Sequence, residues 1–137
     1  MVKNTRAYVD TSAFIALLDK SDLDNPLFVE LFSDPPRLLT SSLVISEGQA
    51  WFLRRYDTRR ALRFLSFINS LVALEIDPVD KRLIHEASVL LQRFSDQELS
   101  LTDAVGLALM SRNRIQTCWS TDRHLGLTGV PLVKAHQ

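Results

Sequence analysis

Four acidic side chains lie within about one helical turn of a predicted strand end or helix start: Asp10, Glu47, Asp103 and Asp122. Carboxylates gathered in one crevice repel one another, by roughly 4 kcal/mol for two unit charges about 4 Å apart at an effective dielectric near 20. That repulsion is relieved when some of the acids are protonated or when a cation binds among them. If the fold brings the four together, they predict the binding of a divalent ion.

The ligand types narrow the choice of ion and of reaction. Oxygen ligands without Cys or His favour Mg²⁺ or Mn²⁺ over zinc. An ion of this kind binds substrate phosphates at its open positions, which suits metal-assisted hydrolysis of a phosphodiester. One of the carboxylates could accept the proton of the attacking water. Each acid taken singly is better explained as a helix cap or turn residue, so the interpretation depends on all four lying together.

Strands alternate with helices along the chain, which predicts an α/β fold with a mostly parallel sheet. Tyr8 and Val9 suit a buried strand, and Asp10 stands at the hinge to the next helix. The other predicted strands cover residues 38–40, 73–76, 116–120 and 131–133, and the predicted helices cover residues 13–18, 26–32, 42–56, 59–71, 79–94 and 104–110. We expect Thr58 and Asp77 to cap the helices that follow them. If the sheet winds both ways from a central first strand, Asp10 and Asp122 lie side by side.

Glu47 falls inside the apolar face when its helix is drawn at about 100° per residue. An unpaired charge there would cost several kcal/mol, which indicates a bound carboxylate. Placement at the edge of the face, or an ion pair with Arg54, explains the same pattern. Gly48 and Gly106 cost about 1 kcal/mol each relative to alanine in a helix, and close helix packing is the interpretation we favour.

Composition bounds the class of protein. The 137 residues fit a single domain over residues 1–137. The formal net charge of +0 counts against a protein that coats nucleic acid by bulk electrostatics. The single Cys118 cannot form an internal disulfide, so we expect a reduced, cytoplasmic location. We expect no signal peptide, and no segment approaches the ~18 apolar residues that a membrane span needs.

Short motifs in a fixed order resemble the PIN-domain family, and in size and layout the VapC-type toxin ribonucleases of toxin–antitoxin pairs. The motifs are Tyr8-Val9-Asp10-Thr11-Ser12, Val44-Ile45-Ser46-Glu47, Leu101-Thr102-Asp103-Ala104 and Ser120-Thr121-Asp122-Arg123-His124. The resemblance implies a PIN-like fold, with a five-stranded, mostly parallel sheet between helices in a three-layer α/β/α arrangement. It also implies an endoribonuclease that depends on Mg²⁺ or Mn²⁺.

The same resemblance implies roles for individual residues and for partners. Asp10, Glu47, Asp103 and Asp122 would form the catalytic and metal-binding site. Ser12, Thr102 and Ser120 would be the supporting hydroxyls. An RNA substrate, a cognate antitoxin protein and a homodimer are also implied. The predicted helix over residues 59–71 is apolar on more than one face, which fits either self-association or a helix enclosed within the domain.

Arginines concentrate in one stretch, and they are candidates for contacts with the RNA backbone. The predicted RNA contacts are Arg54, Arg55, Arg59, Arg60 and, next to Asp122, Arg123. A solvated helix corner explains the first four equally well. We expect Trp51 and Trp119 to lie in the core rather than to stack on bases.

Two other functions fit parts of the pattern. An aspartyl phosphotransfer domain would phosphorylate an Asp after a strand. However, Ser12 stands where the dehalogenase type has a second acid. The paired acids of a receiver are also missing, although Lys134 could act as its lysine. The other alternative is a PIN-like interaction module without turnover, but a binding scaffold has no reason to accumulate four repelling acids.

Overall fold

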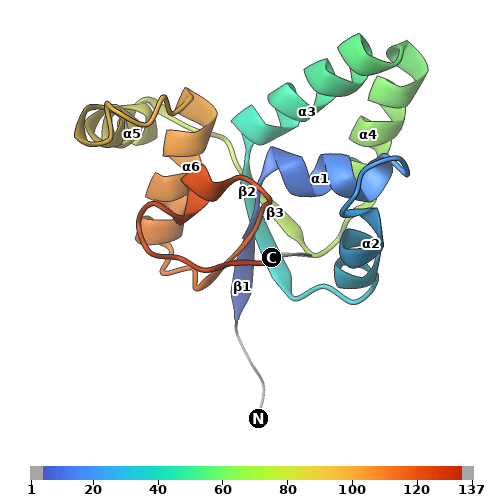
Figure 1. Ribbon diagram of the computed structural model, residues 1–137, viewed down its shortest axis with the longest axis horizontal. Coiled ribbons are helices and arrows are strands. Elements are labelled where there is room, and N and C mark those ends of the chain that lie inside the picture. Colours follow the sequence, from blue (N-terminus) through green and yellow to red (C-terminus); the bar gives the residue numbers. More distant parts are fainter. Residues whose placement is uncertain (1–4, 134–137) are drawn as a thin grey trace.

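The computed structural model describes residues 5–133, which form a five-stranded sheet in the order β3-β2-β1-β4-β5 (Figure 1). The strands are β1 (Arg6–Val9), β2 (Arg37–Ser41), β3 (Leu74–Asp77), β4 (Thr117–Trp119) and β5 (Leu132–Val133). Every pairing among them is parallel, and Tyr8 lies between Leu39 on β2 and Cys118 on β4. The first strand is therefore central, with β1 and β4 adjacent, as the sequence predicts.

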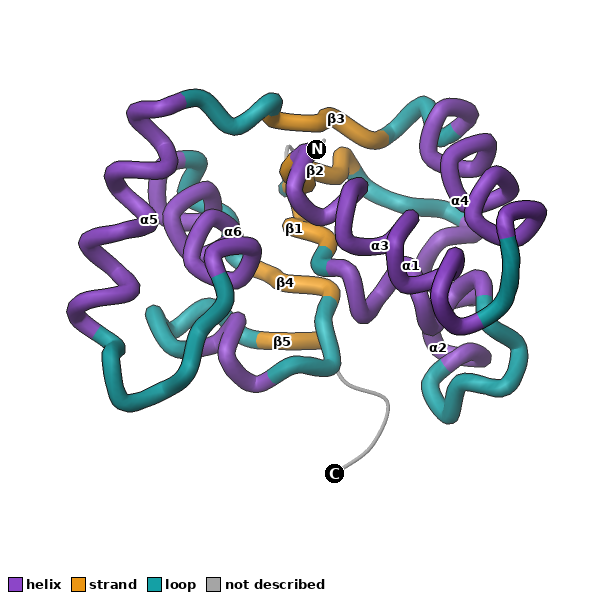
Figure 2. Tube along the Cα trace, turned by 90° about the horizontal axis from the view of Figure 1, so that it is seen from above, coloured by secondary structure: helices purple, strands orange, loops and turns teal. Residues whose placement is uncertain are grey.

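Helices cover both faces of the sheet, which confirms the three-layer α/β/α arrangement (Figure 2). One face carries α1 (Thr11–Leu18), α2 (Asn25–Ser33), α3 (Ser42–Arg55) and α4 (Thr58–Ser70). The other carries α5 (Lys81–Arg93), α6 (Leu101–Arg112) and the short 3₁₀ helix η1 (Arg123–Gly126). None of the helices in the described part of the chain combines the length and apolar character of a membrane span.

Successive side chains along a strand point to opposite faces of the sheet, so the core is divided into two parts, one on each face. Ala7 and Val9 pack with α1 to α4, and Tyr8 packs with α5 and α6. Trp119 lies in the first of these clusters, as expected, with its ring centroid 4.9 Å from that of Phe32. Both layers are anchored to the central strand, which fixes where its carboxyl end lies.

The N-terminal caps of two helices differ from the sequence prediction. Asp57, not Thr58, caps α4 by accepting the N–H of Arg60. Asp80, not Asp77, caps α5. Asp77 ends β3 and accepts the N–H of Val79, whose φ of 55° turns the chain before the helix can begin.

Both helical glycines lie where a side chain would collide, which confirms close packing as their role. A Cβ on Gly48 would lie 2.5 Å from Cζ of Phe64, across the α3–α4 contact. A Cβ on Gly106 would lie 3.0 Å from both the Tyr8 ring and Leu125. These contacts set the positions of α3 and α6, the helices that carry Glu47 and Asp103.

Candidate active site

The structure brings the four acids to one pocket at the carboxyl ends of β1 and β4. Asp10 directly follows β1, and Asp122 follows β4 by three residues. Glu47 comes from α3, and Asp103 comes from the first turn of α6. The pocket has a volume of about 270 Å³ and is lined by Asp10, Thr11, Ser12, Ile15, Glu47, Trp51, Ser100, Asp103 and Asp122.

Two serines hold Asp10. The hydroxyls of Ser12 and Ser120 both donate to Oδ2 of Asp10, each at 3.0 Å. The two hydroxyls also lie 3.2 Å from each other, so they connect the ends of β1 and β4. Asp10 stands at the N-cap position of α1, yet its side chain does not cap the helix. The carboxylate is therefore oriented by two serine hydroxyls, one in the first turn of α1 and one directly after β4.

The other three acids are likewise held through one oxygen in the described hydrogen bonds. Oδ2 of Asp103 accepts the backbone N–H of Ser100 at 3.4 Å, as part of a capping box that starts α6. Oδ1 of Asp122 accepts the backbone N–H of His124 at 3.0 Å. Oε1 of Glu47 accepts the hydroxyl of Thr11 at 2.6 Å. These hydrogen bonds restrain the side chains at the pocket.

The charges at the site are poorly compensated. Burial raises the pKa of Asp10 to about 6, against the hydrogen bonds of Ser120, the Thr11 backbone and Ser12, and the charge of Asp103 raises it further. Burial also raises the pKa of Asp103, and the charges of Asp122 and Glu47 add to the effect. The pocket thus carries surplus negative charge that the described residues do not neutralise.

Of the explanations considered for Glu47, placement at the edge of the apolar face is the one that the structure supports, and burial within that face is not observed. Its side chain is exposed at the edge of the pocket, and no ion pair with Arg54 occurs within residues 5–133. The helical wheel places Glu47 correctly beside Trp51, but this face of α3 borders the pocket rather than the core. Trp51 is accordingly only half-buried.

The remaining predicted residues divide into those at the pocket and those away from it. Ser12 lines the pocket, and Ser120 lies fully buried beneath it. Thr102 is half-buried in the first turn of α6 and does not line the pocket.

None of the predicted RNA-contacting arginines lines the pocket. Arg54, Arg55 and Arg59 are exposed at the outer end of the α3–α4 pair (Figure 1), and the guanidinium of Arg60 lies 4.0 Å above the ring of Tyr56. Arg123 is exposed on η1 and borders a neighbouring pocket of about 330 Å³.

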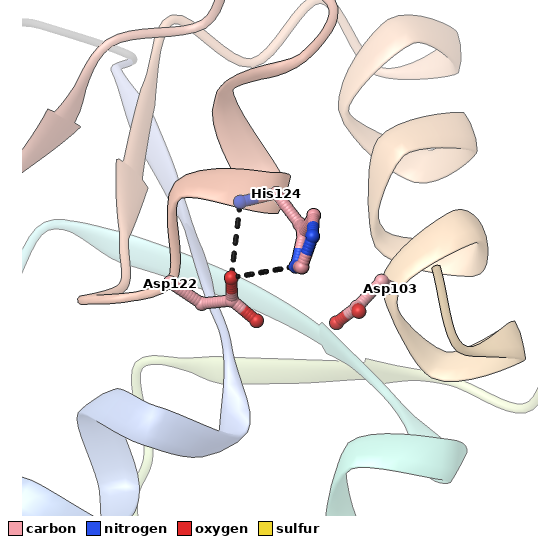
Figure 3. A group of neighbouring side chains, drawn as sticks. All are labelled: Asp103, Asp122 and His124. Carbon is pink, nitrogen blue, oxygen red and sulfur yellow. Dashed lines mark hydrogen bonds and ion pairs between the residues drawn. The ribbon is translucent and has the colours of Figure 1, made fainter. Parts of the chain in front are cut away.

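Three residues that shape the pocket were given no role in the predicted site, although Thr11 and His124 lie within the motifs. Thr11 holds Glu47, and Ser100 holds Asp103. The spacing Ser-x-x-Asp is a capping-box signal that could have identified Ser100. The third is His124, whose Nδ1 lies 3.0 Å from Oδ1 of Asp122 (Figure 3). Its position two residues after an acid carries no comparable signal.

The comparisons with known proteins now decide the family. The family model described as PIN domain matches residues 7–129. The chain belongs to the PIN-domain family. The PIN domain therefore covers nearly all of the described residues, including the four acids. A comparison with curated protein sequences finds no match.

Solved structures similar to this PIN domain include VapC toxins. VapC20 of Mycobacterium tuberculosis, a sarcin–ricin-loop-cleaving toxin, is 27% identical with a TM-score of 0.86, and the match covers 94% of this chain and 99% of that one. A toxin–antitoxin complex from Klebsiella pneumoniae is 20% identical with a TM-score of 0.63, covering 93% and 96%. VapBC2 of Rickettsia felis, bound to a DNA fragment of its promoter, is 14% identical with a TM-score of 0.64, covering 95% and 98%. The predicted PIN-like fold is confirmed.

Proposed function

We propose that this PIN domain is a metal-dependent endoribonuclease that acts as the toxin of a toxin–antitoxin pair. The observation that carries the proposal is the pocket itself. Four carboxylates from distant parts of the sequence line it, and burial and mutual repulsion raise the pKa of both Asp10 and Asp103. The similarity to VapC20, a toxin that cleaves RNA in the sarcin–ricin loop, supports RNA as the substrate class.

The donor set fits a divalent cation. Carboxylate oxygens are the ligands of Mg²⁺ and Mn²⁺, and a cation would relieve the repulsion that now raises the pKa of Asp103. When bound, such an ion supplies an acidified water and stabilises negative charge on the scissile phosphate. Asp10, Asp103 and Asp122 would hold it, and Glu47 at the pocket edge would complete the site.

The hydroxyls around the pocket have a positioning role in this proposal. Ser12 on α1 and Ser120 after β4 would fix the rotamer of Asp10. Thr11 restrains Glu47, which would otherwise move freely at the exposed edge. Thr102 has no contact that gives it a comparable role.

RNA contacts and protein partners are further parts of the proposal. Arg54 lies seven residues after Glu47 on α3, so the two share a helix face about 10 Å apart. Arg54 and Arg123 are therefore the arginines best placed to follow RNA out of the pocket, with Arg55, Arg59 and Arg60 further along α3 and α4. The similarity to toxin–antitoxin complexes supports a cognate antitoxin. A homodimer is proposed from the family and is tested by light scattering of the isolated chain.

A cleavage assay tests the proposal directly. Purified chain is incubated with structured and unstructured RNAs in Mn²⁺, Mg²⁺ or EDTA, beside Asp10→Asn and the exposed-acid control Asp34→Asn. We expect cleavage with metal and none in EDTA, a loss of about 100-fold or more in Asp10→Asn, and full activity in Asp34→Asn. Metal-independent cleavage, or full activity of Asp10→Asn, would contradict the mechanism. Labelling of Asp10 by a small phosphodonor would instead support phosphotransfer; the Lys134 considered for that reaction lies outside the described residues.

A further inference from the structure

An imidazole lies close to two of the pocket's carboxylates: His124 lines the neighbouring pocket and approaches Asp103 and Asp122 from that side. Ligand atoms of Asp103, Asp122 and His124 all lie within 4.8 Å of one another. Figure 3 shows the imidazole of His124 beside both carboxylates, in contact with that of Asp122. The sequence predicts oxygen ligands only, and this arrangement adds a candidate nitrogen ligand beside them.

The distances suit a shared ion. Ligands about 2.1 Å from an octahedral ion lie about 3.0 Å apart when adjacent and about 4.2 Å apart when opposite. Nδ1 of His124 and Oδ1 of Asp122 are 3.0 Å apart, and the whole group lies within 4.8 Å. Side-chain shifts of a few tenths of an ångström, well within rotamer freedom, would therefore bring the three groups into one coordination sphere.

The fold fixes the imidazole at this place. Asp122 caps η1 by accepting the N–H of His124, so the two residues are locked in relative position. The next residue, Leu125, is fully buried and packs where Gly106 leaves space on α6. The side chain of His124 is only 23% exposed. It is thus held by the same helix α6 that carries Asp103, unlike a histidine on a free surface.

We propose that His124 is a nitrogen ligand of the metal centre, and that the Asp103–Asp122–His124 set selects a divalent first-row transition ion over Mg²⁺. The inference rests on the metal site of the proposed function and adds the identity of the ion to it. Imidazole binds transition ions well, whereas Mg²⁺ prefers oxygen and water. Mn²⁺ is the weakest binder of the transition series and so is the most demanding probe. The rival explanation is that His124 only holds Asp122 in place.

Pulsed electron paramagnetic resonance of bound Mn²⁺ separates the two explanations, because it detects a directly coordinated ¹⁴N nucleus. We expect nitrogen coupling in the wild-type chain, which needs no variant. It should persist in His85→Gln and His136→Gln, the chain's other two histidines, and disappear in His124→Gln. Competition binding should show that His124→Gln lowers the affinity for Mn²⁺ about tenfold more than the affinity for Mg²⁺.

Two results would overturn the inference. One is Mn²⁺ bound at the site of the wild-type chain without nitrogen coupling. The other is an equal loss of Mn²⁺ and Mg²⁺ affinity in His124→Gln, which indicates a positioning role alone. Neither measurement uses RNA, so a failure of this inference can be told from a failure of the proposed function. Nitrogen-coupled Mn²⁺ in a chain that does not cleave RNA refutes the proposed function only. RNA cleavage by a chain whose bound Mn²⁺ shows no nitrogen coupling refutes this inference only.

Discussion

Asp10 and Asp19 are carboxylates at the two ends of the same helix, α1, and their electrostatic states are opposite. Both are nearly buried, with exposed fractions of 4% and 6%. Burial raises the pKa of Asp10 to about 6. Burial also acts to raise the pKa of Asp19, but hydrogen bonds from Ser21 and Tyr56 and the charge of Arg55 outweigh it and lower that pKa.

The helix macrodipole alone would give the reverse order. It stabilises a carboxylate at the N-terminus, where Asp10 lies, and destabilises one at the C-terminus, where Asp19 lies. The immediate partners therefore decide. Oδ1 of Asp19 accepts the backbone N–H and the hydroxyl of Ser21 at 3.0 and 2.6 Å, and the Tyr56 hydroxyl lies 3.0 Å from both carboxylate oxygens. Asp10 has two serines but faces other acids.

The comparison separates an acid whose charge is compensated by its neighbours from an acid of the proposed metal site. Asp19 borders a larger cavity of about 460 Å³, which is also lined by Lys20, Arg60 and Arg63, so cations are near its charge. The pocket around Asp10 is smaller but has four acids and no basic side chain in its lining. Cavity size therefore does not identify the site, whereas uncompensated charge does.

Asp10→Asn should have the largest effect on the stability of the fold. The pKa of Asp10 is about 6 in the folded chain, above its ordinary value of 3.8. The stability that protonated Asp10 contributes is therefore fully present below about pH 4 and is lost as the pH rises through 6. In EDTA the variant should gain up to about 3 kcal/mol over wild type at pH 7 and little at pH 4. Denaturant unfolding at the two pH values measures this. A gain that does not depend on pH would contradict the assignment.

Metal addition should reverse that gain. At about 100 times the dissociation constant, Mn²⁺ or Mg²⁺ should stabilise the wild-type fold by about 2.7 kcal/mol. Asp19→Asn should respond equally, because its carboxylate lies at the other end of α1, and Asp10→Asn should not respond. Thermal unfolding with and without EDTA gives the comparison. Equal metal stabilisation of all three chains would remove Asp10 from the site.

Asp19→Asn should destabilise the fold by about 1–2 kcal/mol at neutral pH, opposite in sign to Asp10→Asn, because charge-assisted hydrogen bonds are weakened. The pKa of Asp19 is lower in the folded chain than in the unfolded chain, so ionised Asp19 stabilises the fold at pH values above its unfolded pKa. This stabilisation is lost as the pH falls through the folded pKa. The difference in unfolding free energy between the variant and wild type should therefore shrink in acid. Unfolding at pH 7 and pH 3 tests this, and RNA cleavage by the folded variant should be unchanged. A stabilised Asp19→Asn would end the contrast.

Tyr56→Phe should have the smallest effect, about 1 kcal/mol of destabilisation. It removes the hydroxyl bonded to Asp19 and keeps the ring beneath Arg60. Nuclear magnetic resonance titration should show the pKa of Asp19 rising while that of Asp10 stays in place. If neither moves, Tyr56 is not what lowers the pKa of Asp19.

The sequence predicted the sheet well because strand pattern and parallel connectivity are local and topological properties. The central β1 and the β1–β4 neighbourhood follow from them. The prediction of the capping residue was wrong where two candidate caps lie within a few residues of each other, as with Asp57 and Thr58 or Asp77 and Asp80. Either residue satisfies the rule, and only the path of the chain selects one.

The sequence predicted that the four acids meet in one place, and it did not predict what surrounds them. A helical wheel gives only the direction of a side chain around its own helix axis. It could not show that the face of α3 that carries Glu47 borders a pocket rather than the core. His124 depends on how η1 packs against α6 through Leu125, a contact between segments far apart in sequence. Local patterns carry no information of that kind.

Three of the four acids also stand where helices begin. Asp10 precedes α1, Asp103 completes the capping box of α6, and Asp122 caps η1. Exchanging Asp103 or Asp122 for an apolar residue therefore weakens a helix end as well as the pocket. Glu47 carries no such second task, since it lies in the middle of α3. Among the four positions, natural variation should be widest at 47, and a catalytically dead but well-folded chain is most readily obtained there.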